Sequence, residues 1–379
     1  MKILGVMFHV DISKTVKINA ERTVTCIKTL FKSNQNRLLT VQQRVTFVNI
    51  YALPLLGFIA RTLPVPAEAC RSIQTEVNRF VWRGQHEQLS VQQVCQPVEN
   101  GGLGLINIKI KSKALFHRTF VKHLLDYNNP QSSQLDYLTG MSNPFRTNNN
   151  LPKKEKVNKI FNEVLHFIKK HKATVEEWRM STTKGLYECL LGRDTRKAAI
   201  EIKYPALSFN KIFINITNNH LPARVKEHFF LATHNLLPTR ERLRRCGYTN
   251  NGACSLCGEA DDYYHHLWCS ESQPICRWLA RKIAVIWQHF MSMDKKEVFK
   301  GNFKVNINKI HNTVTWLVAN FSLSLWKARK KIVGRPPDRS VASDLTKEVT
   351  KEINDKTKKL NKQKNRHFVD LPFNFEGMN

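Results

Sequence analysis

Four side chains between residues 254 and 269 have the types and the spacing of a metal site. Cys254 and Cys257 are separated by two residues, and His265 and Cys269 follow in the next segment. Two cysteines at this spacing can bind one metal ion from a tight turn, and a histidine and a third cysteine complete the tetrahedron of a structural zinc site. His266 is an alternative to His265, since only one histidine is needed. Because the protein would fill all four positions, we predict one structural Zn²⁺ in a CCHC loop spanning residues 254–269.

Basic side chains flank this loop on both sides in the sequence. The chain has 60 Lys and Arg residues against 30 Asp and Glu, a formal charge of +30 at pH 7. An excess of this size needs an anionic partner, most often nucleic acid. We therefore predict RNA or DNA as the partner. The candidate phosphate contacts are Arg240, Arg242, Arg244 and Arg245 before the loop and Lys327, Arg329, Lys330 and Lys331 after it.

Three aromatic residues lie inside the loop itself. Tyr263, Tyr264 and Trp268 could stack on unpaired bases. They could equally pack a small core around the metal, and for Trp268 we favour packing.

No arrangement of residues predicts catalysis. Asp261 and Asp262 form an adjacent pair like that of a two-metal polymerase site, but no hydrophobic strands flank it. We interpret the pair as a solvated loop. Asp338 and Asp344 resemble the carboxylates of a metal-dependent nuclease core, but no strand is predicted around them, so we interpret this stretch as a polar tail. The sequence contains no glycine-rich phosphate loop, nucleophile elbow or HExxH motif.

The elements that must position these residues are predicted to be helices, so the fold class is mainly α. Apolar residues recur at three- and four-residue steps in most of the chain. Such series include Val157, Ile160, Phe161, Val164, Leu165 and Ile168; Val225, Phe229 and Ala232; Leu279, Ile283, Ile286 and Phe290; and Ile310, Val314, Leu317, Phe321 and Leu325. Pro238 is expected to split a helix that runs from about 222 to 245. The opening residues, by contrast, predict a buried β-strand.

The helical series divide the chain into four parts. Residues 1–125 form a first helical region, and residues 126–152, rich in Asn, Ser, Gln and Pro, form a polar linker. A second helical region covers 153–331 and contains the cysteine and histidine loop. Residues 332–379, with few apolar side chains, are predicted to be a basic, disordered tail.

Composition also indicates where the chain works. Nine cysteines, an odd number in a long basic chain, favour a reducing compartment, so we expect the nucleus or the cytoplasm. The N-terminus lacks the pattern of a signal peptide. No apolar run approaches the roughly 18 residues that span a bilayer, so we expect no membrane partner.

Several short motifs, in this order, resemble the C-terminal part of non-LTR (LINE-type) retrotransposon reverse transcriptases. The opening Lys2-Ile3-Leu4-Gly5-Val6-Met7-Phe8 is similar to the strand that follows the family's polymerase palm. Motifs similar to those of the family's thumb region and zinc-binding domain follow at residues 51–54, 63–66, 80–82, 101–105, 184–187, 234–240 and 325–329. The resemblance covers roughly residues 1–331. It implies a thumb-like region over 1–125 and a reverse-transcriptase zinc-binding domain over 153–331.

This chain departs from the family in two ways. The family places four residues between its last histidine and cysteine, whereas three follow His265 here and two follow His266. The fingers and palm, with their catalytic aspartates, have no counterpart. The resemblance therefore implies a zinc-stapled nucleic-acid-binding fragment without polymerase activity of its own. The alternatives are a component of an RNA-directed DNA polymerase or endonuclease whose palm is supplied elsewhere, and an inert or domesticated interaction module.

Overall fold

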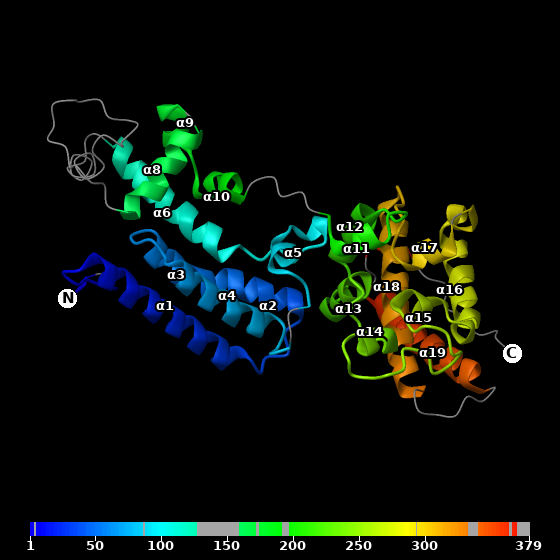
Figure 1. The fold of residues 1–379 in the computed structure, drawn as a ribbon. Coiled ribbons are helices and arrows are strands. Elements are labelled where there is room, and N and C mark those ends of the chain that lie inside the picture. The colour runs from blue at the N-terminus through cyan, green and yellow to red at the C-terminus, as the bar shows by residue number, and fades with distance from the viewer. Residues whose placement is uncertain are drawn as a thin grey trace. The chain divides into compact units, whose positions relative to one another are not determined.

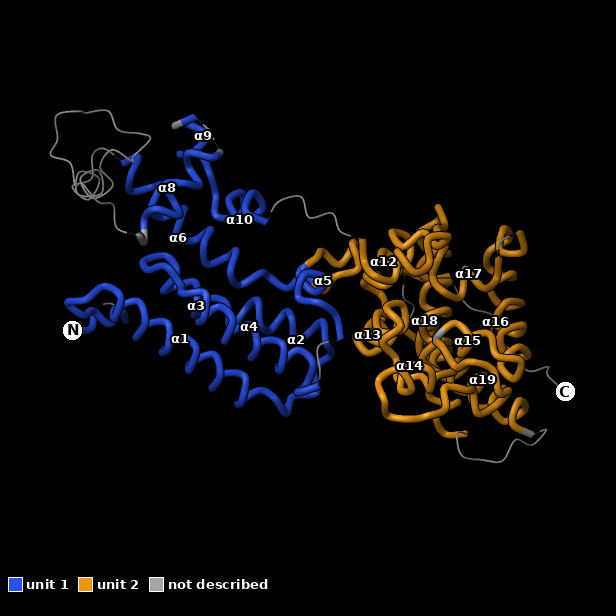
Figure 2. The backbone as a smooth tube through the Cα atoms, in the orientation of Figure 1, with its two compact units in different colours: residues 1–95, 104–196 blue, residues 96–103, 197–379 orange. Residues whose placement is uncertain are grey.

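The computed structural model describes the chain except for residues 4, 86–87, 127–158, 172–173, 192–196, 293, 333–339, 364–365 and 370–379. The chain divides into two compact units, shown in different colours in Figure 2. Unit 1 comprises residues 1–95 and 104–196, and unit 2 comprises residues 96–103 and 197–379. Helices make up most of the described part of both units (Figure 1), so the prediction of a mainly α fold is confirmed.

Unit 1 opens with a short β-hairpin where a single buried strand was predicted. Strand β1 (Lys2–Ile3) pairs antiparallel with β2 (Val6–Met7). Gly5 turns the chain between them at φ +87°, a left-handed value that glycine adopts at little cost. The Asn19 side chain accepts a bond from the Met7 N–H at 2.9 Å and donates one to the Met7 carbonyl at 2.7 Å. These bonds hold the hairpin against α1 (Ile12–Asn34).

The rest of unit 1 is helical. After α1 the chain forms α2 (Val41–Phe47), the π-helical segment η1 (Val48–Ala52), α3 (Leu53–Ala60), α4 (Ala67–Val81), α5 (Val91–Cys95), α6 (Ile108–Leu125), α8 (Lys159–His171), α9 (Val175–Met180) and α10 (Thr183–Leu191). The last three helices share a hydrophobic core with α6 that includes Phe120, Val164 and Trp178. Helices on both sides of the predicted 126–152 linker thus belong to one unit. Residues 127–152 themselves lie outside the described residues.

One helical run in unit 1, Val41–Ala60, is long and apolar enough to cross a membrane by length and composition alone. Half of that stretch is buried inside the protein, where Val45, Val48 and Leu56 contribute to the core. Core helices of globular proteins pass the same test, so the run is weak evidence for a membrane span.

Unit 2 contains the predicted CCHC loop. Its elements are the 3₁₀ turn η2 (Val98–Asn100), α11 (Ala199–Lys203), α12 (Phe209–Thr217), α13 (Ala223–Thr233), α14 (Arg240–Arg245), α15 (Tyr263–Trp268), η4 (Ser270–Ser272), α16 (Gln273–Ile286), η5 (Gln288–Ser292), α17 (Lys295–Phe299), α18 (Asn308–Ile332) and α19 (Ser340–Lys362). The predicted break near Pro238 separates α13 from α14. Helix α18 is the centre of this unit, because α13, α15, α16, α17 and α19 all contact it.

The tail predicted to be disordered contains a packed helix, so that prediction is wrong for residues 340–362. Val341, Leu345, Val349 and Ile353 of α19 are buried, and they recur at four-residue steps on one face. On the flank of this face, the Lys327 ammonium of α18 lies 3.1 Å from the Glu352 carboxylate. Only a few apolar residues were needed to form this stripe, and the many charged residues between them obscured it in the sequence.

Candidate metal centre

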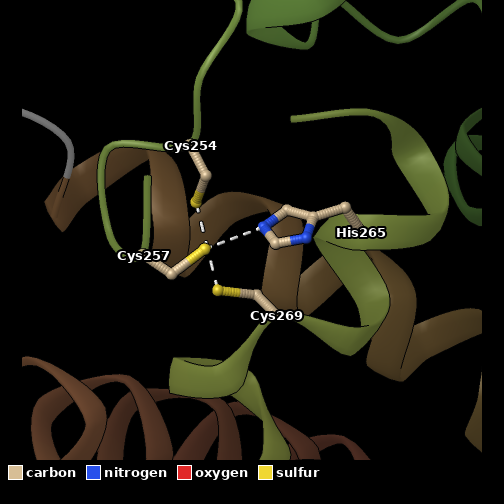
Figure 3. Close-up of side chains that lie close together, drawn as sticks. All are labelled: Cys254, Cys257, His265 and Cys269. Carbon is tan, nitrogen blue, oxygen red and sulfur yellow. Dashed lines mark hydrogen bonds between the residues drawn. The ribbon is translucent and has the colours of Figure 1, made fainter. Parts of the chain in front are cut away.

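The four residues of the predicted site lie together in unit 2 (Figure 3). The ligand atoms of Cys254, Cys257, His265 and Cys269 all lie within 4.8 Å of one another. The sulfurs of Cys254 and Cys269 are 4.0 Å apart, and the Cys257 sulfur lies 3.1 Å from His265 Nε2. The side chains point toward one another from a loop, a short helix and the residue that ends that helix.

The loop that carries the first two cysteines is shaped by its own backbone. The Leu256 N–H points at the Cys254 sulfur at 3.4 Å, and the Gly258 N–H donates to the Cys254 carbonyl at 2.9 Å. Gly258 has φ +83°, which a side chain would oppose. The loop closes because the Cys254 N–H donates to the Glu259 carbonyl at 2.6 Å. Both cysteines are therefore presented from one tight turn.

Helix α15 supplies His265, and Cys269 is the residue that ends this helix. Asp262 caps its N-terminus by accepting a bond from the His265 N–H at 2.7 Å. His265 and Cys269 are four residues apart, one helical turn, and therefore emerge on the same side. The Glu259 carboxylate lies 3.1 Å from His265 Nδ1, so this nitrogen carries the proton and Nε2 faces the thiols.

The alternative ligand His266 lies elsewhere. Its ring is buried and packs edge-on against Trp326 of α18, with 4.9 Å between ring centroids. The structure thus brings His265, and not His266, to the three cysteines.

A second layer of charged residues surrounds the cluster. The buried Arg329 guanidinium, on α18, donates to the Cys254 sulfur at 3.2 Å and to Asp261 Oδ1 at 3.0 Å. The other carboxylate oxygen of Asp261 accepts a bond from the Arg240 N–H at 3.1 Å. Asp261 therefore joins the loop to α14 and α18, which corrects its interpretation as a solvated residue.

These contacts shift the pKa values of the cysteine and histidine ligands. The bond from the Cys269 thiol is the largest effect lowering the pKa of Cys254, and the Arg329 charge adds to it. The bond to Cys254 in turn raises the pKa of the Cys269 thiol. The pKa of His265 is raised, first by its interaction with Cys254. The cluster thus favours a thiolate at Cys254, the form that binds a metal.

The donor set and its dimensions fit zinc. Around a tetrahedral zinc with Zn–S distances of about 2.3 Å and a Zn–N distance of about 2.0 Å, ligand atoms lie roughly 3.5–3.8 Å apart. The observed separations of 4.0 and 3.1 Å fall on either side of that range. Since all four ligand atoms lie within 4.8 Å of one another, shifts of up to about 1 Å would bring the ligands to zinc distances.

The predicted phosphate contacts have different environments. Arg329 is buried in the second layer, which corrects its prediction as a phosphate contact. Lys330 is exposed and lies 4.9 Å from the Trp326 ring centroid, while Lys327 and Lys331 pair with glutamates of α19. On α14, the Arg244 and Arg245 guanidiniums pair with the Glu241 carboxylate, at 2.8 and 3.3 Å. The Arg242 guanidinium donates to the Asn235 carbonyl at 2.9 Å, and the Arg240 side chain is partly exposed.

Sequence reasoning missed Arg329 and Glu259 as partners of the ligands. Glu259 lies between Cys257 and His265, so its place in the loop was a usable signal. Nothing in the sequence connects Arg329 to Cys254, because α18 comes to the loop only through the packing of unit 2.

Comparison with known proteins gives one match in this region. Residues 194–274 match the sequence model of a family described as zinc-binding in reverse transcriptase. The matched segment contains all four clustered residues and ends at the start of α16. No curated protein matches the chain. The match and the cluster together indicate a reverse-transcriptase-associated zinc-binding domain.

Proposed function

We propose that this chain is the thumb and zinc-binding part of a non-LTR retrotransposon reverse transcriptase, and that it binds RNA or DNA. The observation that carries the proposal is the gathering of Cys254, Cys257, His265 and Cys269 inside the segment that matches the zinc-binding family. The ordered motifs of residues 1–125 support the assignment to a thumb-like region. The natural setting would be the nucleus or the cytoplasm, beside the remainder of the polymerase.

In this proposal one Zn²⁺ is held by the four residues and is structural. All four ligand positions are occupied by protein side chains, so no open position remains for a catalytic water. A zinc ion with three thiolates carries a net charge of −1, and the Arg329 guanidinium beside Cys254 offsets part of it while also facing the Asp261 carboxylate. The metal would fix the loop between α14 and α15 and with it the surrounding basic side chains.

Nucleic-acid binding is supported by charge. The chain carries +30, and Arg240, Arg244, Arg245 and Lys330 are at least partly exposed. The neighbouring Glu241 weakens the attraction at Arg244 and Arg245 but does not cancel it, since one carboxylate faces two guanidiniums. We propose binding without polymerisation, because the aspartate pair in the loop has structural roles: Asp261 pairs with Arg329, and Asp262 caps α15.

The first test is zinc content, measured on purified protein with Cys257→Ser and Cys246→Ser compared side by side. Cys246 is exposed and lies outside the cluster, so it is the matched control. One zinc per chain, lost in Cys257→Ser and kept in Cys246→Ser, is the expected result. No zinc in the wild-type protein would refute the proposal of a zinc site.

The second test is RNA binding across a salt series. Phosphate-driven affinity falls steeply as salt rises. A salt-sensitive affinity that decreases on zinc removal is expected. An affinity indifferent to salt would favour a domesticated protein-interaction module instead. Metal-dependent primer extension by this chain alone would favour the polymerase alternative.

A further inference from the structure

Three aromatic side chains form a short series on unit 2. Tyr204 ends α11, and Tyr264 and Trp268 lie four residues apart, on one face of α15. The rings of Tyr204 and Tyr264 meet edge to face, with centroids 4.7 Å apart and planes at 87°. All three side chains are partly exposed, and the Trp268 ring also packs against the buried Phe299, with 5.6 Å between ring centroids, as favoured from the sequence.

A lysine accompanies each of these rings. The Lys300 ammonium lies 4.1 Å from the centroid of Tyr264, Lys296 lies 5.7 Å from Trp268, and Lys203 lies 5.1 Å from Tyr204. Because Lys296 and Lys300 are also four residues apart, a row of lysines on and just after α17 runs beside the row of aromatic residues on α15. These six residues are called the stacking surface below.

The stacking surface continues into a basic cavity through Lys203. This cavity has a volume of about 340 Å³ and lies between α11 and α14. Of the described residues that line it, Lys203, Arg242 and Arg245 are basic and none is acidic. Glu241 lies just outside the cavity and pairs with Arg245 at 3.3 Å. Phosphate groups are the anions that such a set of ammonium and guanidinium groups recognises.

We infer that unit 2 binds nucleic acid as a single strand, with unpaired bases on the rings of the stacking surface and phosphates at the Lys203 end. Aromatic rings beside basic groups are how proteins hold single strands, because every base offers a face to stack on. This inference rests on the proposed nucleic-acid binding and names the form of nucleic acid that is bound.

The lysines over the rings do not prevent stacking. Lys203 and Lys296 are exposed and Lys300 is half-buried, and an ammonium at such positions makes a weaker contact with a ring than a stacked base does. A base can therefore displace the ammonium, which then turns to the adjacent phosphate. Duplex nucleic acid cannot make the same exchange, because its bases are already stacked on one another.

Charge alone does not explain this surface. Burial lowers the pKa of Lys300, and the nearby Asp294, Glu297 and Asp262 carboxylates oppose this shift and weaken the attraction of Lys300 for phosphate. Stacking must therefore supply the affinity at the Tyr264 end, while phosphate contacts supply it at the Lys203 end. The two contributions differ in their dependence on salt, and this difference makes them separable.

The experiment compares Tyr204→Leu with Tyr204→Phe in the zinc-loaded chain of 379 residues. Affinities for a short oligouridine and for an RNA duplex of equal length are measured across a salt series. Tyr204→Leu should weaken oligouridine binding about 5- to 150-fold without changing the salt slope, and leave duplex binding unchanged. Tyr204→Phe keeps the ring and should bind like wild type. Lys203→Gln should instead reduce the salt slope by about 0.7.

Equal affinity of Tyr204→Leu and wild type for oligouridine would overturn the inference and leave the proposed function standing. Absence of binding to either RNA by zinc-loaded wild-type protein would instead refute the proposed nucleic-acid binding. Since the leucine variant could misfold, a thiouridine-substituted oligouridine is also photo-crosslinked to wild-type protein. Crosslinks at Tyr204, Tyr264 or Trp268 are expected, and crosslinks confined to other residues would refute the inference.

Discussion

Arg329 offers the sharpest test of how unit 2 supports the metal cluster. Its guanidinium lies 3.0 Å from Asp261 Oδ1, and the two side chains are only 7% and 13% exposed. At an effective dielectric constant of about 20, two unit charges at that distance attract by roughly 5–6 kcal/mol. Desolvation offsets much of this attraction, but removing one partner leaves the other charge buried alone. We therefore expect Arg329→Met to lower the free energy of unfolding by about 3–5 kcal/mol.

The assay is urea unfolding of the zinc-loaded protein, with zinc release to a chelator measured in parallel. Zinc should leave Arg329→Met faster, because the Cys254 thiolate loses the donor at 3.2 Å. Lys331→Met is the control on the same helix: its pair with Glu348 is 67% exposed on the lysine side, so its loss should leave the urea midpoint almost unchanged.

A second variant isolates the reason for the loss. Asp261→Asn removes the charge that Arg329→Met leaves unpaired, so the double variant should be more stable than Arg329→Met alone. The reasoning fails if Arg329→Met unfolds at the same urea concentration as Lys331→Met, or if the double variant recovers nothing.

Three further predictions concern the packing of unit 2. Burial lowers the pKa of His228 to about 3 and that of His234 to about 4, so the unfolded chain binds protons near pH 6.5 that the folded chain does not. The free energy of unfolding should therefore fall as pH drops from 6.5 to about 4. Each of the two histidines should contribute up to about 1.4 kcal/mol to this fall per pH unit. Urea unfolding measured at a series of pH values should show a shallower fall for His228→Gln than for wild type. Gly301→Ala places a Cβ 2.7 Å from Phe229 at φ +86° and should cost about 1–3 kcal/mol in the same assay. Ile353→Ala should cost about 2–5 kcal/mol by thermal unfolding, whereas a disordered tail would show no change.

The metal cluster could be predicted from the sequence because its ligands are local. Cys254 and Cys257 are held by one turn, and His265 and Cys269 by one turn of helix, so spacing alone brings them close. The choice between His265 and His266 could not be made this way. It depends on Trp326, which holds the second ring away from the thiols and lies far along the chain.

The boundaries of the two units were harder to predict than their helices. Periodicity identifies α8 as amphipathic but does not say which helix covers its apolar face. In the structure that face meets α6, so residues after the predicted linker return to the unit before it. The helix α19 was missed for a related reason: its apolar stripe is narrow, and it becomes a core element only where it packs against α18, α16 and η4.

The basic residues show most clearly what composition alone leaves open. A positive charge of +30 indicates an anionic partner, but it does not say which side chains face that partner. Arg329 contacts the cluster and Asp261, Lys327 and Lys331 pair with α19, and Lys203 lines a cavity between α11 and α14. Some lysine and arginine side chains thus stabilise the fold, and others remain accessible to a ligand. Only the accessible group can set the salt dependence of binding, so the number of released counterions should be far smaller than the net charge.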